Sequence, residues 1–158
     1  MTEPGKLPTS GYVFDRVYTN NLAMRVTALK EDAPSEPPLL FSWDWKLLSP
    51  DRKTFEVLIN VGVDPSVKRQ EELRVTICGR FRAEGDHQEV SLENFVRFHA
   101  PAILMPFARE TISNLTTRGF YDTLVLPPLN VQMLMERQDL AATTGAKQLM
   151  ELNANPQP

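Results

Sequence analysis

The alternation of apolar and polar residues predicts four β-strands in the first half of the chain. Residues 54–63 give the clearest pattern, because every second side chain from Phe55 to Val63 is apolar, as expected when successive side chains of a strand point to opposite faces. The phase of the first strand breaks near Asn20–Asn21, which predicts a bulge or a bend. The predicted strands are residues 12–29, 39–48, 54–63 and 73–82.

The connections between these strands predict how they pair. Three prolines fall within residues 31–38; they lack backbone donors and favour an irregular crossing loop after the first strand. The other connections are short, and short connections favour an antiparallel meander.

The spacing changes from strand-like to helical after Gly85. Ser91 is placed to cap a short helix over residues 92–99. Pro101 suits the first turn of a second helix, and Gly119 stops that helix after Arg118. Pro106 lies inside it, which predicts a kink or a delayed start.

Apolar residues on one face of the second helix are candidates for burial. Leu104, Ile112 and Leu115 share that face, and we expect them to be buried between protomers or against the sheet. Asn130 is expected to cap a last helix over residues 131–139.

Together these elements predict an α+β fold: a four-stranded antiparallel sheet followed by two to three helices. We expect a flexible leader over residues 1–10, one domain over residues 11–139 and a polar C-terminal tail over residues 140–158.

Composition narrows the classes of function. The net charge is −3, which differs from the basic stripe of a nucleic-acid-binding protein. The first ten residues lack the apolar segment of a secretory signal, and no segment approaches the roughly 20 apolar residues of a membrane-spanning helix. We therefore expect a cytoplasmic protein that binds no nucleic acid and does not insert into the membrane.

Few residues are suited to catalysis or to binding a cofactor. The chain has no Gly-rich phosphate loop, and the spacing of His87 and His99 matches no metal site or acid–base pair. Cys78 is the single cysteine, and no base accompanies it in the sequence. These three residues motivate only a remote alternative, a small-molecule-binding protein or enzyme.

An aromatic stripe on the second strand has two interpretations. Phe41, Trp43 and Trp45 alternate along one face, so they form either the core or part of an open apolar groove. The same choice applies to Met133 and Met135 on the last helix, because methionine adapts to irregular partners. Periodicity alone leaves both interpretations open.

Four segments, in order, resemble the SecB family of protein-export chaperones. The most specific is residues 101–110, PAILMPFARE, with two prolines five residues apart. The other segments are Arg16-x-Tyr18-Thr19, Phe41-x-x-Asp44-Trp45, and Arg118-Gly119 followed by Leu124-x-Leu126-x-Pro128-x-Asn130.

This resemblance implies a homotetramer built as a dimer of dimers, with no enzymatic activity and no cofactor. It also implies that unfolded polypeptide clients bind in apolar grooves and pass to the SecA export motor. By position, the client-binding groove would draw on Leu39, Leu40, Phe41, Trp43, Trp45, Leu129, Met133 and Met135.

The chain departs from the family pattern where export-dedicated members carry acidic residues that contact the motor. Those positions hold Asn21, Arg25 and Arg74 here, and a change of charge at an interface costs affinity and association rate. The leading hypothesis is a chaperone that keeps precursors competent for export. The alternative is a dedicated chaperone of one partner, such as an antitoxin.

Overall fold

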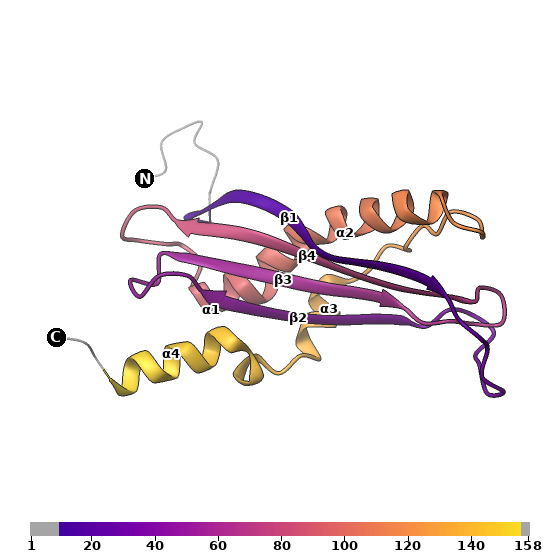
Figure 1. Ribbon diagram of the computed structural model, residues 1–158. Coiled ribbons are helices and arrows are strands. Elements are labelled where there is room, and N and C mark those ends of the chain that lie inside the picture. Colours follow the sequence, from indigo (N-terminus) through magenta and orange to yellow (C-terminus); the bar gives the residue numbers. More distant parts are fainter. Residues whose placement is uncertain (1–9, 156–158) are drawn as a thin grey trace.

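The computed structural model describes residues 10–155 and confirms the predicted α+β arrangement (Figure 1). All four predicted strands form, and the third has the predicted bounds. The strands are β1 (Tyr12–Val26), β2 (Leu39–Leu47), β3 (Thr54–Val63) and β4 (Glu71–Ala83).

The strands pair in the order β1-β4-β3-β2, and every pair is antiparallel. Strands β2, β3 and β4 form the expected meander. The proline-rich crossing loop carries the chain from β1, at one edge of the sheet, to β2 at the other edge. The two edge strands are therefore consecutive in the sequence.

Strand β1 is irregular at two points. Its register against β4 shifts between Thr19 and Asn21, where the sequence predicts a bulge or a bend. A second shift, between Phe14 and Arg16, was not predicted. Such shifts bend a strand and increase its local twist, which gives β1 the bent course visible in Figure 1.

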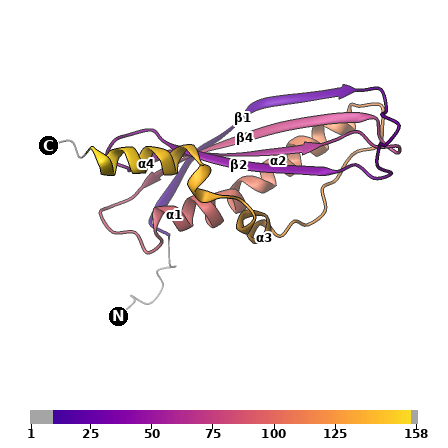
Figure 2. The same cartoon turned by 90° about the horizontal axis from the view of Figure 1, so that it is seen from below.

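One helical segment covers a single face of the sheet (Figure 2). It consists of α1 (Leu92–Asn94), the π-helical turn η1 (Phe95–His99) and α2 (Ala100–Thr117). The predicted cap is present, since the Ser91 hydroxyl accepts a hydrogen bond of 3.2 Å from the Asn94 amide. Pro106 lies within α2 and does not delay its start.

The core lies between this helical segment and the alternate residues of β2, β3 and β4. Leu104 and Ile112 are fully buried there, and Leu115 is half-buried. A Cβ at Gly79 would lie 2.6 Å from the Leu104 side chain, so glycine lets α2 approach the sheet closely. The core side chains of α2 therefore pack within the protomer, against the sheet.

The C-terminal region holds more regular structure than expected. Helix α3 (Val131–Glu136) begins at its predicted cap, where the Asn130 side chain accepts from the Met133 amide at 3.0 Å. A 3₁₀ turn, η2 (Leu140–Ala142), and helix α4 (Thr144–Ala154) follow. The stretch expected to be a polar tail thus contains a helix, which lies beside β2 in Figures 1 and 2.

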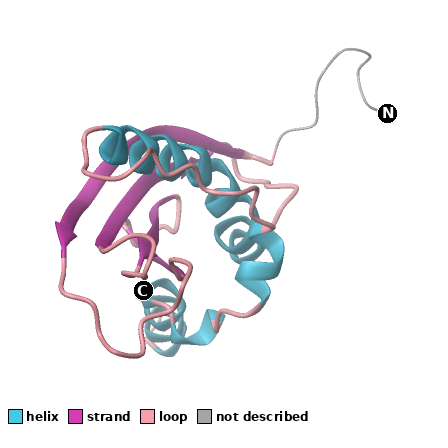
Figure 3. Cartoon of the chain, turned by 90° about the vertical axis from the view of Figure 1, so that its right-hand side faces the viewer, coloured by secondary structure: helices cyan, strands magenta, loops and turns pink. Residues whose placement is uncertain are grey.

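Seen from the end of the sheet, the strands and helices surround the core (Figure 3).

Candidate functional site

Among residues 10–155, no helix lies over the sheet face opposite α2, and a buried carboxylate lies in the middle of that face. Glu56 is 5% exposed and accepts a hydrogen bond of 2.6 Å from the Tyr18 hydroxyl. Lys46 lies 3.4 Å and Arg80 4.0 Å from its carboxylate oxygens. The hydrogen bond to Glu56 and burial raise the pKa of Tyr18 above its usual value. Two cations and one hydroxyl therefore compensate for the burial of this charge.

A second polar row crosses the same face. Asn60 donates to the Ser42 hydroxyl at 2.9 Å and accepts from the Thr76 hydroxyl at 2.6 Å. Leu40 and Arg74 help to line a cavity of about 330 Å³ beside this row. The helix-free face thus combines a shallow hollow with mixed polar and apolar walls.

Asn21, Arg25 and Arg74, which the family resemblance suggests as altered motor-interface positions, lie on this helix-free face. Asn21 pairs with Thr76 in the register of β1 and β4, and Arg25 pairs with Glu72. Arg25 forms an ion pair of 3.0 Å with Glu72, and Arg74 forms one of 2.6 Å with Asp64. Both basic side chains are therefore already paired with acids of this chain.

Three of the residues predicted to line a client groove are instead buried in the core. Trp43 is 6% exposed, Trp45 1% and Met135 0%. The alternation of β2 turns both indoles toward the helices, where the Trp43 ring N–H donates to the Val96 carbonyl at 2.9 Å. Trp43, Trp45 and Met135 are therefore not accessible in this protomer, and their place in a client groove stays a prediction.

The other predicted groove residues remain accessible to different degrees. Leu40 is 40% exposed and Met133 50% exposed. Leu39, Phe41 and Leu129 are half-buried and pack against the edge of the core. Leu40 points to the helix-free face, opposite to Leu39 and Phe41, so the five predicted groove residues of β2 are divided between two faces.

Sequence reasoning missed several of the most exposed apolar side chains. Phe120 is 87% exposed, Val125 68%, Val26 62% and Leu22 49%. Phe120 and Val125 lie in the connection after α2, outside any periodic run, so the pattern of the sequence gives no signal for them. Leu22 and Val26 lie on β1 after the register shift between Thr19 and Asn21.

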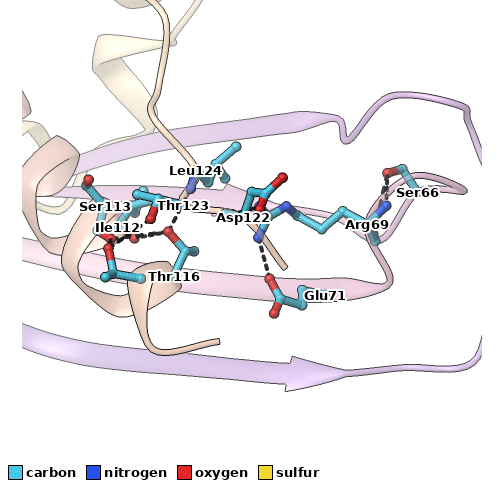
Figure 4. A network of polar contacts seen from close by, with 10 residues as sticks. Ser66, Arg69, Glu71, Ile112, Ser113, Thr116, Asp122, Thr123 and Leu124 are labelled. Carbon is cyan, nitrogen blue, oxygen red and sulfur yellow. Dashed lines mark hydrogen bonds and ion pairs between the residues drawn. The ribbon is translucent and has the colours of Figure 1, made fainter. Parts of the chain in front are cut away.

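A buried ion pair positions that connection after α2 (Figure 4). Arg69 contacts Glu71 at 2.5 Å and donates to the backbone carbonyl of Asp122. In the last turn of α2, the Thr116 hydroxyl accepts a hydrogen bond of 2.8 Å from the Leu124 amide. These bonds fix the segment that presents Phe120 and Val125.

The structure offers little support for catalysis at Cys78 or His99, and His87 lies in the loop between β4 and α1, where it helps to line a cavity. Cys78 is buried, and burial is the main cause that raises the pKa of its thiol, which disfavours the nucleophilic thiolate. The His99 ring stacks on Phe95 with centroids 5.7 Å apart. Residues 10–155 contain no group of three His, Cys, Asp or Glu side chains placed to hold a metal ion.

None of the helices between residues 10 and 155 combines the length and the apolar character needed to cross a bilayer.

Comparison with known proteins assigns the chain to a family. The family model described as "Preprotein translocase subunit SecB" matches residues 11–142. The protein-export protein SecB of Methylococcus capsulatus is 24% identical over 146 residues, covering 87% of this chain and 91% of that protein. The SecB of Halorhodospira halophila is 33% identical over 90 residues, covering 54% of this chain and 50% of that protein.

A solved structure supports the fold. A SecB-like chaperone of Mycobacterium tuberculosis, in complex with a ChAD peptide from the HigA1 antitoxin, superposes with a TM-score of 0.59 at 19% identity. The match covers 75% of this chain and 90% of that one. Since the family model spans the whole sheet and the helices up to η2, the chain belongs to the SecB family.

Proposed function

We propose that this protein is a chaperone that binds unfolded polypeptides and keeps them competent for export. The observation that carries the proposal is the match of the SecB family model to residues 11–142. The exposed apolar side chains of Leu40, Met133 and Phe120 support it, because apolar area exposed to water gains free energy when it is covered.

The proposed mechanism needs no covalent chemistry and no cofactor. A holding chaperone that binds the unfolded state removes it from aggregation by mass action. Binding through apolar area and backbone hydrogen bonds accepts many sequences. Leu39, Leu40, Phe41, Leu129 and Met133 remain the proposed client-binding residues.

A dedicated chaperone of one partner is the second candidate. One observation favours it, since the structural neighbour was solved with an antitoxin peptide. The family resemblance also suggests that the basic residues Arg25 and Arg74 stand where export-dedicated members carry acids. Contact with the SecA motor through that face would have to replace the ion pairs to Glu72 and Asp64.

We also propose that the protein works in the cytoplasm as a homotetramer, a dimer of dimers. Four chains of 17.9 kDa give a particle of about 72 kDa. Several binding surfaces on one particle hold a long client more tightly than one surface does. Light scattering that finds only monomers at micromolar concentration would contradict the tetramer.

An aggregation assay tests the proposed function. Purified protein, at one tetramer per client, is expected to delay light scattering by insulin whose disulfides are being reduced. The same mass of serum albumin serves as the control for nonspecific protection. A client aggregation rate equal to that of the albumin control would refute the holding function.

Capture of bound chains in the native host separates the two candidates. Covalent capture followed by mass spectrometry would find many secreted precursors for an export chaperone, and one dominant partner for a dedicated chaperone.

A further inference from the structure

Helix α4 occupies the free edge of β2 with side-chain hydrogen bonds. The Leu47 amide donates to the Gln148 side-chain oxygen at 2.7 Å, and the Gln148 amide group lies 3.5 Å from the Leu47 carbonyl. The Gln148 side-chain amide therefore contacts both the backbone N–H and the backbone carbonyl of Leu47. These are the groups that a neighbouring strand would use.

The start of α4 is bound to the same edge. One carboxylate oxygen of Asp44 accepts from the backbone amides of both Trp45 and Thr144, at 2.9 and 2.8 Å. The other oxygen accepts from the Thr144 hydroxyl at 2.6 Å. Farther along, Arg52 donates to the Asn153 side chain at 2.6 Å. Most of these contacts are polar and lie at the surface, where water can replace them.

The closest approach of α4 to the sheet is between Gly145 and the Trp45 ring. A Cβ at Gly145 would lie 2.3 Å from the Trp45 ring, so only glycine allows α4 to lie this close. Helix α4 covers Trp45 without satisfying its polar group, because the buried indole N–H has no acceptor among residues 10–155. A buried donor without a partner opposes the covered state.

Cavities flank α4 on both sides. One, of about 480 Å³, lies between α4 and the turn after β2, and includes Leu48 and Leu152. The other, of about 560 Å³, includes Trp45, Leu149 and Met150. Helix α4 thus contacts the core through the half-buried side chains of Leu149 and Leu152, with a cavity on either side of this contact.

We infer that α4 is a displaceable occupant of the β2 edge, and that an extended apolar stretch of client chain replaces it there. This inference rests on the proposed function. The client backbone would take the hydrogen bonds that Gln148 and Asp44 now make, as in the addition of a strand to a sheet edge. Departure of α4 would uncover Trp45 for an apolar side chain, and its N–H for a client carbonyl.

Two substitutions in α4 test the inference by weakening its attachment. Gly145→Ala pushes the helix off Trp45, while alanine favours the helical conformation more than glycine does. Gln148→Ala removes the bonds to Leu47. Lys147→Ala is the matched control, because Lys147 is exposed on the same helix and its side chain makes none of these contacts.

The measurement is the affinity for reduced, carboxymethylated α-lactalbumin, a chain that stays unfolded. If the open state is populated at about a tenth, freeing α4 lowers the apparent Kd by about tenfold, and a rarer open state gives a larger decrease. We expect that gain for Gly145→Ala and Gln148→Ala and an unchanged Kd for Lys147→Ala. An unchanged or raised Kd in both α4 variants would overturn the inference.

Hydrogen–deuterium exchange of the wild-type complex provides the second readout. Bound α-lactalbumin should accelerate exchange in residues 144–154 and leave the amides of β2 protected. Equal protection of α4 with and without client would also overturn the inference. Failure of the wild-type protein to bind the client at all would instead refute the proposed function.

Discussion

The hydroxyl of Tyr18, on β1, donates a hydrogen bond of 2.6 Å to the carboxylate of Glu56, on β3. The two residues lie on opposite sides of β4, so this bond spans three strands of the helix-free face. It contributes one of the three partners of a carboxylate that is 5% exposed.

We expect Tyr18→Phe to lower the free energy of unfolding by about 1–2 kcal/mol, because a bond to a buried charge is lost. The change would appear as a lower urea midpoint with an unchanged slope. Tyr121→Phe is the matched control, because its hydroxyl makes no hydrogen bond within residues 10–155. Equal midpoints for Tyr18→Phe and wild type would contradict a stabilising role for the bond.

Stability is expected to fall in alkaline solution. The hydrogen bond to Glu56 raises the pKa of Tyr18 above 10.0, and burial raises the pKa of Cys78 above 9.0. As the pH rises, both groups therefore ionise at a lower pH in the unfolded chain than in the folded one. Their stabilising effect is complete below about pH 9 and is lost as the pH rises through the folded-state values.

Urea titrations at successive pH values above 8 check this expectation. Each raised group adds a slope of up to about 1.4 kcal/mol per pH unit. Tyr18→Phe lacks one of them, so its stability should fall less steeply than that of wild type above pH 10. Parallel curves for the two proteins would show that Tyr18 does not titrate differently on folding.

Truncation of Leu104, the α2 residue that packs over Gly79, should lower the stability of the fold. Leu104→Ala is expected to lower the free energy of unfolding by about 2–5 kcal/mol, because Leu104 is fully buried and the sheet cannot fill the resulting cavity. Val125→Ala, at a position that is 68% exposed, should change it by less than about 0.5 kcal/mol. Thermal unfolding followed by circular dichroism distinguishes the two.

The Arg69–Glu71 pair should show strong coupling. Either Arg69→Met or Glu71→Leu alone leaves one charge buried and should cost about 3–5 kcal/mol. The double variant removes both charges and should be more stable than either single variant. A double-mutant cycle in urea measures this, and additive costs would contradict the pairing drawn in Figure 4.

Charges at the remaining proposed client residues should weaken client binding. Leu40→Glu and Met133→Glu replace exposed apolar area with a charge that resists burial, and we expect the Kd for an unfolded client to rise about fivefold or more. Val67→Glu, at a position that is 60% exposed in the turn before β4, is the control. An equal effect of all three would indicate a nonspecific influence of net charge.

The sequence predicts the sheet well, because strand signals are local. Alternation from Phe55 to Val63 sets the bounds of β3, and the change of phase near Asn20 marks a true register shift. The side chains of Ser91 and Asn130 cap helices as their types predict. Such signals need no knowledge of the tertiary structure.

The candidate site was predicted less well, because it depends on what lies over each face. Alternation places Trp43 and Trp45 on one side of β2 but does not tell whether a helix covers that side. Helix α4 itself is weakly patterned, and its position depends on Asp44 and Trp45, a hundred residues earlier in the chain. Contacts this distant leave no periodic signal near residue 145.

The hydrogen bond between Gln148 and Leu47 also disfavours pairing of the β2 edge with the sheet edge of a second copy of the chain. An open strand edge is a template for adding identical copies, one after another, into a ribbon. The Gln148 side-chain amide occupies the backbone groups of Leu47 at the β2 edge. Two register shifts distort β1 at the opposite edge of the sheet. Neither edge strand of the sheet therefore offers a regular, open row of backbone groups to a second copy of the chain.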